Sequence, residues 1–153
     1  MKRHLVLLAS LVGFVSLAAA APASAQIGLR TGVSGNPDQF FFGAHVESAP
    51  IADRLRFRPN VEFGVGDDVT LVALNFEFVY SIPLRRQPWR VYFGGGPAAN
   101  IYSFDDSRGG DTDVEPGFNI LIGIQHTRGL FAELKIGTID SPDVKFAVGY
   151  VFR

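Results

Sequence analysis

The sequence has no cysteine among its 153 residues, which excludes disulfides, catalytic thiolates and cysteine-anchored lipids. Its formal net charge is only −1, and this argues against nucleic acid as a partner, because phosphate binding needs a basic surface. It also lacks a zinc-ligand spacing, a phosphate loop and a dinucleotide fingerprint, so we expect no cofactor and no bound metal. Glycine (17 residues) and phenylalanine (14 residues) are both abundant.

The first 25 residues have the three parts of a secretory signal peptide. Lys2 and Arg3 give a positive start, the apolar stretch LVLLASLVGFVSLAAA follows, and the small residues ASA at 23–25 fit a cleavage site. The alternative is an uncleaved membrane anchor. We predict that residues 1–25 are removed on export, and that residues 26–153 form a single domain.

Turn-forming residues divide this domain into segments of regular length. Seven breaks lie at 34–39, 49–54, 66–68, 84–88, 105–113, 127–129 and 140–143. They predict eight strands near 27–33, 40–48, 55–65, 69–83, 89–104, 114–126, 130–139 and 144–152. After the signal peptide, no window favours a helix of useful length.

The last segment, KFAVGYVFR at 145–153, shows how the strands are built. Phe146, Val148, Tyr150 and Phe152 alternate with residues that are charged or small. Successive strand residues point to opposite faces, so this strand has one apolar face and one polar face. The other segments alternate in the same way, and their polar residues are interleaved with glycines.

Volume and charge indicate that the polar face points inward. An eight-stranded barrel has an interior only just wide enough for side chains, and more than twenty large apolar residues would overfill it. The opposite arrangement would also put six basic side chains against lipid, at about 2–4 kcal/mol each near the midplane. These six are Arg30, Arg56, Arg58, Arg90, Lys135 and Lys145. We therefore predict an all-β, antiparallel, up-and-down transmembrane β-barrel.

The ends of the strands support a membrane-spanning arrangement. Tyr80, Trp89, Tyr150 and Phe152 are predicted to gather at one end as an aromatic belt. Because the number of strands is even, both termini should lie at that end. Every aspartate except Asp53 then falls in the outer connections: Asp38, Asp67, Asp68, Asp105, Asp106, Asp111, Asp113, Asp140 and Asp143. The opposite end holds Arg54, Arg85, Arg86, Arg128 and Arg153.

Two interpretations of the acidic connections remain open. Aspartate is a common turn residue, and this alone explains its position. Alternatively, the carboxylates could bind divalent cations that bridge to lipopolysaccharide phosphates. The stretch DDSRGGDTD at 105–113 lacks the ordered spacing of a dedicated calcium loop.

Four segments, RVYFGGGPAANIYSF, GFNILIGIQH, GLFAELKIG and VKFAVGYVF, are typical of one group of proteins. With them, residues 26–153 resemble the small eight-stranded outer-membrane β-barrels of Gram-negative-type bacteria. The resemblance implies residence in the cell outer membrane, with both termini in the periplasm and the barrel in contact with the lipid bilayer and lipopolysaccharide. It also implies insertion by the outer-membrane assembly machinery, and we expect a monomer.

The inward charges are expected to form a structural cluster of Glu47, Arg56, Arg58 and Glu77. Folding about residues 49–54 sets Glu47 opposite Arg56 and His45 near Arg58, and Glu77 reaches Arg58 or Arg56. Glu133 should fall near Gln125. A salt-bridged plug is the first interpretation, because an unpaired buried charge is costly. A gate that admits small solutes is the second.

These features predict a non-enzymatic integral outer-membrane protein with an envelope-structural or surface-interaction role. A catalytic triad cannot be constructed from Ser81, Ser103 or Ser107, and in QHTRG no serine lies two residues after His126. Three alternatives stay open: a narrow pore for small solutes, a lipid-modifying outer-membrane enzyme, and a soluble periplasmic ligand-binding barrel of lipocalin type.

Overall fold

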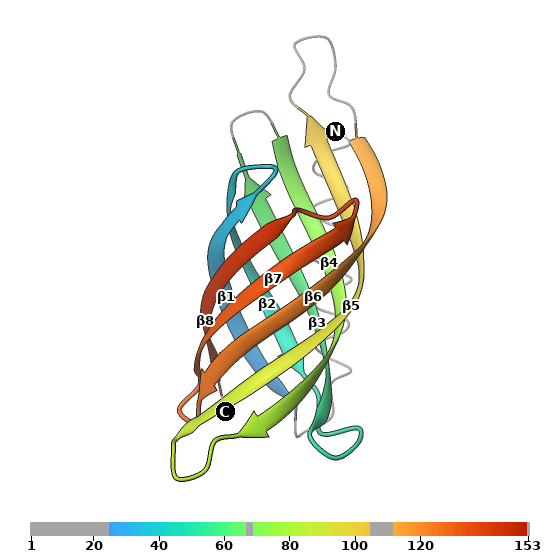
Figure 1. Cartoon of the computed structure of the whole chain (residues 1–153). Helices are drawn as coiled ribbons and strands as arrows, with labels where there is room; N and C mark the ends of the chain where they lie inside the picture. Colours follow the sequence, from blue (N-terminus) through green and yellow to red (C-terminus); the bar gives the residue numbers. More distant parts are fainter. Residues whose placement is uncertain (1–24, 67–68, 105–111, 153) are drawn as a thin grey trace.

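The computed structural model describes residues 25–66, 69–104 and 112–152. Eight strands follow one another in these residues: β1 (Gln26–Gly35), β2 (Gln39–Glu47), β3 (Leu55–Val65), β4 (Val69–Pro83), β5 (Trp89–Phe104), β6 (Thr112–His126), β7 (Leu130–Ile139) and β8 (Val144–Phe152). Each strand pairs antiparallel with the next, and β1 pairs with β8, so the sheet closes into a barrel (Figure 1). The described residues contain no helix long and apolar enough to cross a membrane.

The predicted fold class and strand order are confirmed. Five strands, β3, β4, β5, β7 and β8, have the predicted bounds. The bounds of β1, β2 and β6 differ from the predicted ones by one or two residues at an end, and β6 begins at Thr112 because its pairing with β5 continues as far as Ser103 and Thr112. The predicted signal peptide lies almost wholly outside the described residues and stays a prediction.

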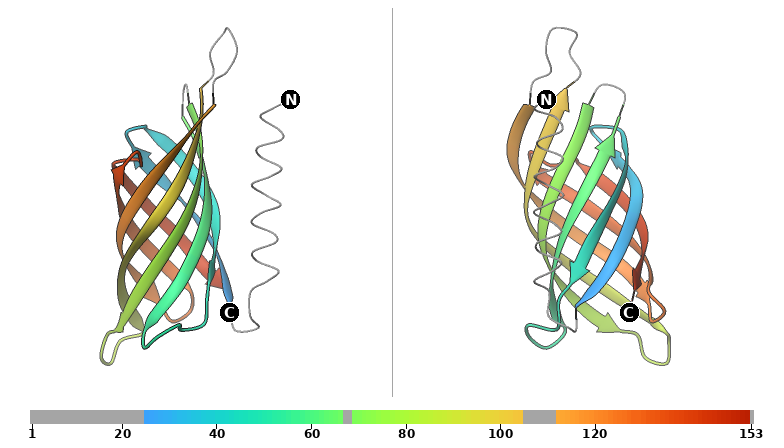
Figure 2. Two further views of the ribbon diagram at one scale, coloured as in Figure 1. Left: turned by 90° about the vertical axis from the view of Figure 1, so that its right-hand side faces the viewer. Right: turned by 180° about the vertical axis from the view of Figure 1, so that it is seen from behind.

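The two ends of the barrel differ in shape. β1 begins and β8 ends at one end, beside the short turns β2–β3, β4–β5 and β6–β7 (Figures 1 and 2). We call this the terminal end, and the other the distal end. β4, β5 and β6 have 15, 16 and 15 residues, whereas the other strands have 9 to 11. The longer strands extend the distal end on one side of the barrel (Figure 1).

The side chains divide between the two faces as the alternation predicts. On the outside, Phe40 and Ile122 are 57% and 54% exposed. On the inside, Glu77 and Lys135 are 0% and 2% exposed. Val46, Val61 and Val72 are also buried, although their register places them on the apolar face. The barrel therefore exposes large apolar side chains on its outside and buries charged side chains inside, which is the opposite of a soluble protein.

Candidate functional site

Ionised side chains cross the lumen and join strands that are not neighbours in the sheet. Glu62 on β3 accepts hydrogen bonds from three cations. The distances are 2.9 Å from Arg30 Nη1 on β1, 3.0 Å from Lys135 Nζ on β7 and 2.8 Å from Lys145 Nζ on β8. One carboxylate thus connects four strands.

Glu133 on β7 also accepts hydrogen bonds from three side chains, those of Arg30, Arg58 and Tyr92. Its Oε1 accepts a hydrogen bond of 3.1 Å from Arg30 Nη2, and its Oε2 accepts hydrogen bonds from Arg58 Nη2 and, at 3.0 Å, from the Tyr92 hydroxyl. The Arg58 guanidinium also lies over the Tyr92 ring, 5.1 Å from its centroid. Glu133 therefore ties β1, β3 and β5 to β7.

Glu77 completes what we call the central network. It pairs with Arg58 Nη2 at 3.3 Å and with Lys135 Nζ at 2.6 Å. The network consists of Arg30, Arg58, Glu62, Glu77, Glu133, Lys135 and Lys145, all of them buried. Four cations and three carboxylates give it a formal charge of +1. Each carboxylate contacts at least two cations, which offsets the large cost of removing the charges from water.

A second, smaller group lies nearer the terminal end, and we call it the mouth cluster. Glu47 at the end of β2 pairs with Arg56 Nε at 3.4 Å and Arg90 Nη2 at 3.2 Å. Arg90 also donates from Nε to Gln125 Oε1 at 3.0 Å. The side chains of Arg56 and Arg90 are each 21% exposed, so this cluster is partly open to solvent.

The predicted cluster of Glu47, Arg56, Arg58 and Glu77 is divided between these two groups. Glu47 and Arg56 lie in the mouth cluster, whereas Arg58 and Glu77 lie in the central network. Arg58 stands directly opposite Glu77, as in one of the two predicted registers.

The predicted register of β2 against β3 is wrong by two residues. His45 pairs with Asn60, not with Arg58. The reason is that the turn closes between Ala52 and Leu55, later than the middle of the loop. Glu133 stands opposite Gly123, two residues from Gln125 along β6 and on the same inward face.

The prediction gave no charged partner to five residues of the central network: Arg30, Glu62, Glu133, Lys135 and Lys145. Alternation places all five on the inward face, but register along a hairpin reveals only partners on adjacent strands. Arg30 and Glu62 are two strands apart, and Glu62 reaches Lys135 across the lumen. A signal does exist in the sequence, because inward Lys135 and Lys145 stand opposite each other on β7 and β8 and need a carboxylate from elsewhere.

Neutral polar groups also cross the interior. Asn75 Nδ2 donates to Asn60 Oδ1 at 2.7 Å, and Asn119 Nδ2 donates to Asn75 Oδ1 at 2.7 Å. This row of amides joins β3, β4 and β6 and satisfies side chains that are almost fully buried.

Three inward rings lie against glycines on the adjacent strand. Tyr92 stands opposite Gly123, Phe131 opposite Gly149, and His45 opposite Gly28. A methyl group built on any of these glycines would overlap the ring beside it. Small residues thus provide the space that large interior rings require.

His45 was expected to join the charge cluster, and it does lie inside the barrel. Its side chain is fully buried and its ring meets the edge of Phe131, with the centroids 5.5 Å apart. Neither ring nitrogen has a hydrogen-bond partner in the part of the chain that the structure describes.

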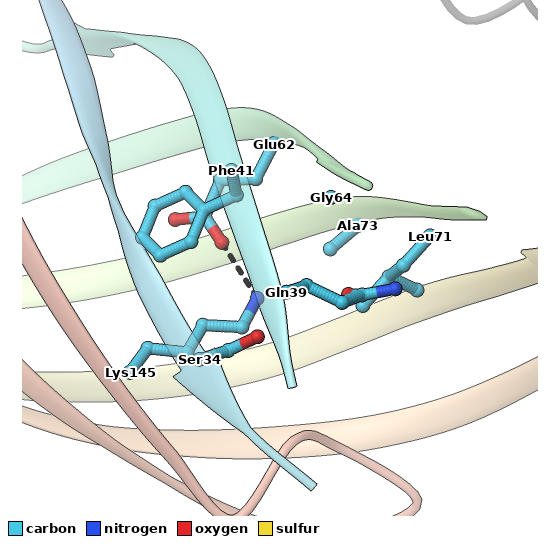
Figure 3. A pocket seen from close by; sticks show the side chains of 8 residues that line it. All are labelled: Ser34, Gln39, Phe41, Glu62, Gly64, Leu71, Ala73 and Lys145. Atoms are coloured by element: carbon cyan, nitrogen blue, oxygen red, sulfur yellow. Dashed lines mark hydrogen bonds and ion pairs between the residues drawn. The ribbon is translucent and has the colours of Figure 1, made fainter. Parts of the chain in front are cut away.

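A small recess lies inside the barrel on the distal side of the central network (Figure 3). Its lining residues are Ser34, Gln39, Phe41, Glu62, Gly64, Leu71, Ala73 and Lys145. The Lys145–Glu62 ion pair lies beside it, and the recess has no volume that a water molecule could occupy.

Comparison with known proteins identifies the architecture. No family model and no curated protein matches the sequence. Several solved structures match its fold, including the following three. The N-terminal β-barrel domain of Pseudomonas aeruginosa OprF has a TM-score of 0.64 at 15% identity, covering 84% of this chain and 96% of that domain. Neisserial surface protein A (NspA) has a TM-score of 0.61 at 15% identity, covering 83% and 91%. Ail, the attachment invasion locus protein of Yersinia pestis, has a TM-score of 0.53 at 11% identity, covering 84% and 97%.

The fold is that of the small eight-stranded outer-membrane barrels. An outer-membrane-type barrel keeps its apolar side chains toward lipid and closes its sheet, so that no backbone edge is exposed to hydrocarbon. Both properties are present here.

The four residues predicted to form an aromatic belt lie at the terminal end of this outer-membrane-type barrel. Tyr150 and Phe152 are 44% and 51% exposed and contact each other edge to face, at 5.2 Å between centroids. Tyr80 packs beside Phe93, and Trp89 packs edge-on against His126.

The predicted acidic outer connections are described only in part. Asp38, Asp113, Asp140 and Asp143 lie at the distal end, whereas Asp67, Asp68, Asp105, Asp106 and Asp111 lie outside the described residues. Asp143 accepts a hydrogen bond of 2.9 Å from Asn36 Nδ2. Among the described residues, no group of three or more histidines and carboxylates is arranged to hold a metal ion.

Proposed function

We propose that this chain is a non-enzymatic integral protein of the outer membrane, with an envelope-structural or surface-interaction role. The central network is the observation that carries the proposal. Its seven charged side chains come from β1, β3, β4, β7 and β8 and bond to one another across the lumen. A barrel braced in this way is a closed scaffold that presents its loops and its outer surface.

A narrow pore is the main competing function. The central network and the recess both oppose it, because a solute would have to separate buried ion pairs to pass. Opening a path would require several charges to lose their partners together, in an interior with little spare volume.

Conductance across planar lipid bilayers tests the closed-lumen proposal. We expect the purified protein to show no discrete channel openings. Glu62→Gln weakens the pairing of three cations at once and should give openings or a leak, whereas Glu115→Gln, a distal-end control outside the central network, should stay silent. Steady channels in the unaltered protein would establish the pore instead.

The other two alternatives receive less support. A lipocalin-type soluble barrel needs an apolar interior with space for a ligand, whereas this interior is filled by ion pairs and amides. For a lipid-modifying enzyme, His126 would need a nucleophile beside it, but its Nδ1 instead accepts a hydrogen bond of 3.0 Å from the backbone of Arg128. Mass analysis of lipid A after overexpression tests this alternative, and we expect no change.

A further inference from the structure

The two ends of the barrel carry opposite charge. Five described carboxylates lie at the distal end: Asp38, Asp113, Glu115, Asp140 and Asp143. Four exposed arginines lie at the terminal end: Arg54, Arg85, Arg86 and Arg128. We call these four the basic collar, because they come from the three turns that surround the terminal end of the lumen (Figure 2).

Little in the described structure neutralises the basic collar. Asp53 is the one carboxylate of the described residues that pairs with it, at 3.8 Å from Arg54 Nε. The side chain of Asp53 is 90% exposed, and an ion pair so open to water contributes little. The arginines therefore remain available to an anion from outside the protein.

Backbone strain marks two of the four arginines. Arg54 and Arg86 both have φ of 61°, in the left-handed region that favours glycine or asparagine. They occupy two separate turns, β2–β3 and β4–β5. Asn36 and Ile139, near the distal end, have the same backbone conformation, with φ of 52° and 60°, so it is a feature of these turns and not of the arginines alone.

Apolar residues accompany the arginines at the level of the membrane interface. Ile51, Leu84 and Leu130 are 55%, 38% and 54% exposed and belong to, or directly follow, the same three turns. Tyr80, Trp89, Tyr150 and Phe152 lie at the same end. Guanidinium groups just beyond an apolar and aromatic band are at the depth of lipid phosphates, which arginine binds through its paired N–H donors.

We propose that the basic collar binds the phosphate groups of anionic phospholipids in the leaflet that surrounds the terminal end. This inference rests on the proposed function, since it requires the barrel to span a bilayer. Charge complementarity is its basis: an arginine near an anionic membrane surface can strengthen binding about fivefold. Acidic side chains at the distal end would be repelled by the same head groups, so the two ends would also favour one orientation.

The proposal is tested with the purified protein reconstituted in phosphatidylcholine bilayers that contain trace nitroxide-labelled lipid. The fraction of motionally restricted label is compared for phosphatidylglycerol and phosphatidylcholine. We expect at least about twofold stronger association of phosphatidylglycerol, which weakens at high salt. The variant R54Q/R85Q/R86Q/R128Q should show no preference. The matched control D38N/D113N/E115Q/D140N should keep or increase it.

Three outcomes would overturn the proposal: equal association in the unaltered protein, a preference that survives in the collar variant, or a preference that is lost in the distal control. Equal association of the two lipids would favour an acidic periplasmic protein as the partner of the basic collar instead. Failure of the proposed function is distinguishable, because a barrel outside the bilayer would restrict neither lipid.

Discussion

At the scale of single residues, the barrel depends on where it keeps its charges. Seven buried charged side chains form the central network, and none of the three carboxylates in it relies on a single partner. Several partners for each carboxylate matter because a buried ion that loses its only partner destabilises the fold by far more than the intact ion pair stabilises it. The pairing in the central network is therefore best tested by replacing a cation that pairs with two carboxylates.

Arg58 is such a residue, since it contacts both Glu77 and Glu133. Arg58→Leu leaves two buried carboxylates short of a partner, and we expect it to lower the free energy of unfolding by about 3–5 kcal/mol. Denaturant titration of the folded protein in detergent micelles, followed by tryptophan fluorescence, measures this. Arg128→Leu, in an exposed turn, should unfold close to the unaltered midpoint. Identical midpoints for the two variants would refute the assigned pairing.

At the scale of strands, pairing brings interior rings onto glycines. Gly123 on β6 leaves room for the Tyr92 ring on β5, and the ring position sets the Tyr92 hydroxyl 3.0 Å from Glu133. The glycine therefore supports both the packing of two strands and one bond of the central network.

Gly123→Ala should push the Tyr92 ring away and cost about 1–3 kcal/mol of stability through overpacking. In a Tyr92→Leu background, Gly123→Ala should lower the free energy of unfolding much less. A double-mutant cycle should therefore give a coupling energy between positions 92 and 123 above about 0.5 kcal/mol. Gly35→Ala is the control, because the nearest atom to its added methyl group is Asp38 Oδ1 at 3.8 Å. Additive effects of the Gly123 and Tyr92 substitutions would contradict the contact.

Much of the fold at this scale could be predicted from the sequence, since strand bounds and faces depend on local information. Alternation with a period of two set the face of Phe146 and Val148, and turn residues such as those at 84–88 set the ends of β4 and β5. Of the central network, only the Arg58–Glu77 pair could be predicted, because Glu62 and Glu133 bond across the lumen to strands that are distant in the sheet. The predicted β2–β3 register is wrong for a different reason, because the turn closes late in the loop, between Ala52 and Leu55.

At the scale of the whole molecule, the distribution of polarity and charge points to one environment. Large apolar side chains cover the outside, ion pairs fill the inside, and the ends carry opposite charge. In water the exposed apolar surface would favour aggregation, whereas in a bilayer it is buried by acyl chains. The central claim is thus that the outer face meets lipid.

A nitroxide scan along β6 tests this claim most directly, because the chain has no cysteine of its own. Single cysteines are placed at Phe118, Asn119, Ile120, Leu121 and Ile122, labelled, and measured in lipid bilayers. Molecular oxygen partitions into hydrocarbon, so its collision rate should peak at 118, 120 and 122, where the native side chains are 40%, 54% and 54% exposed. Minima should fall at Asn119 and Leu121, which are each 2% exposed. The reverse pattern, or a collision rate without a period of two, would contradict the membrane-spanning barrel.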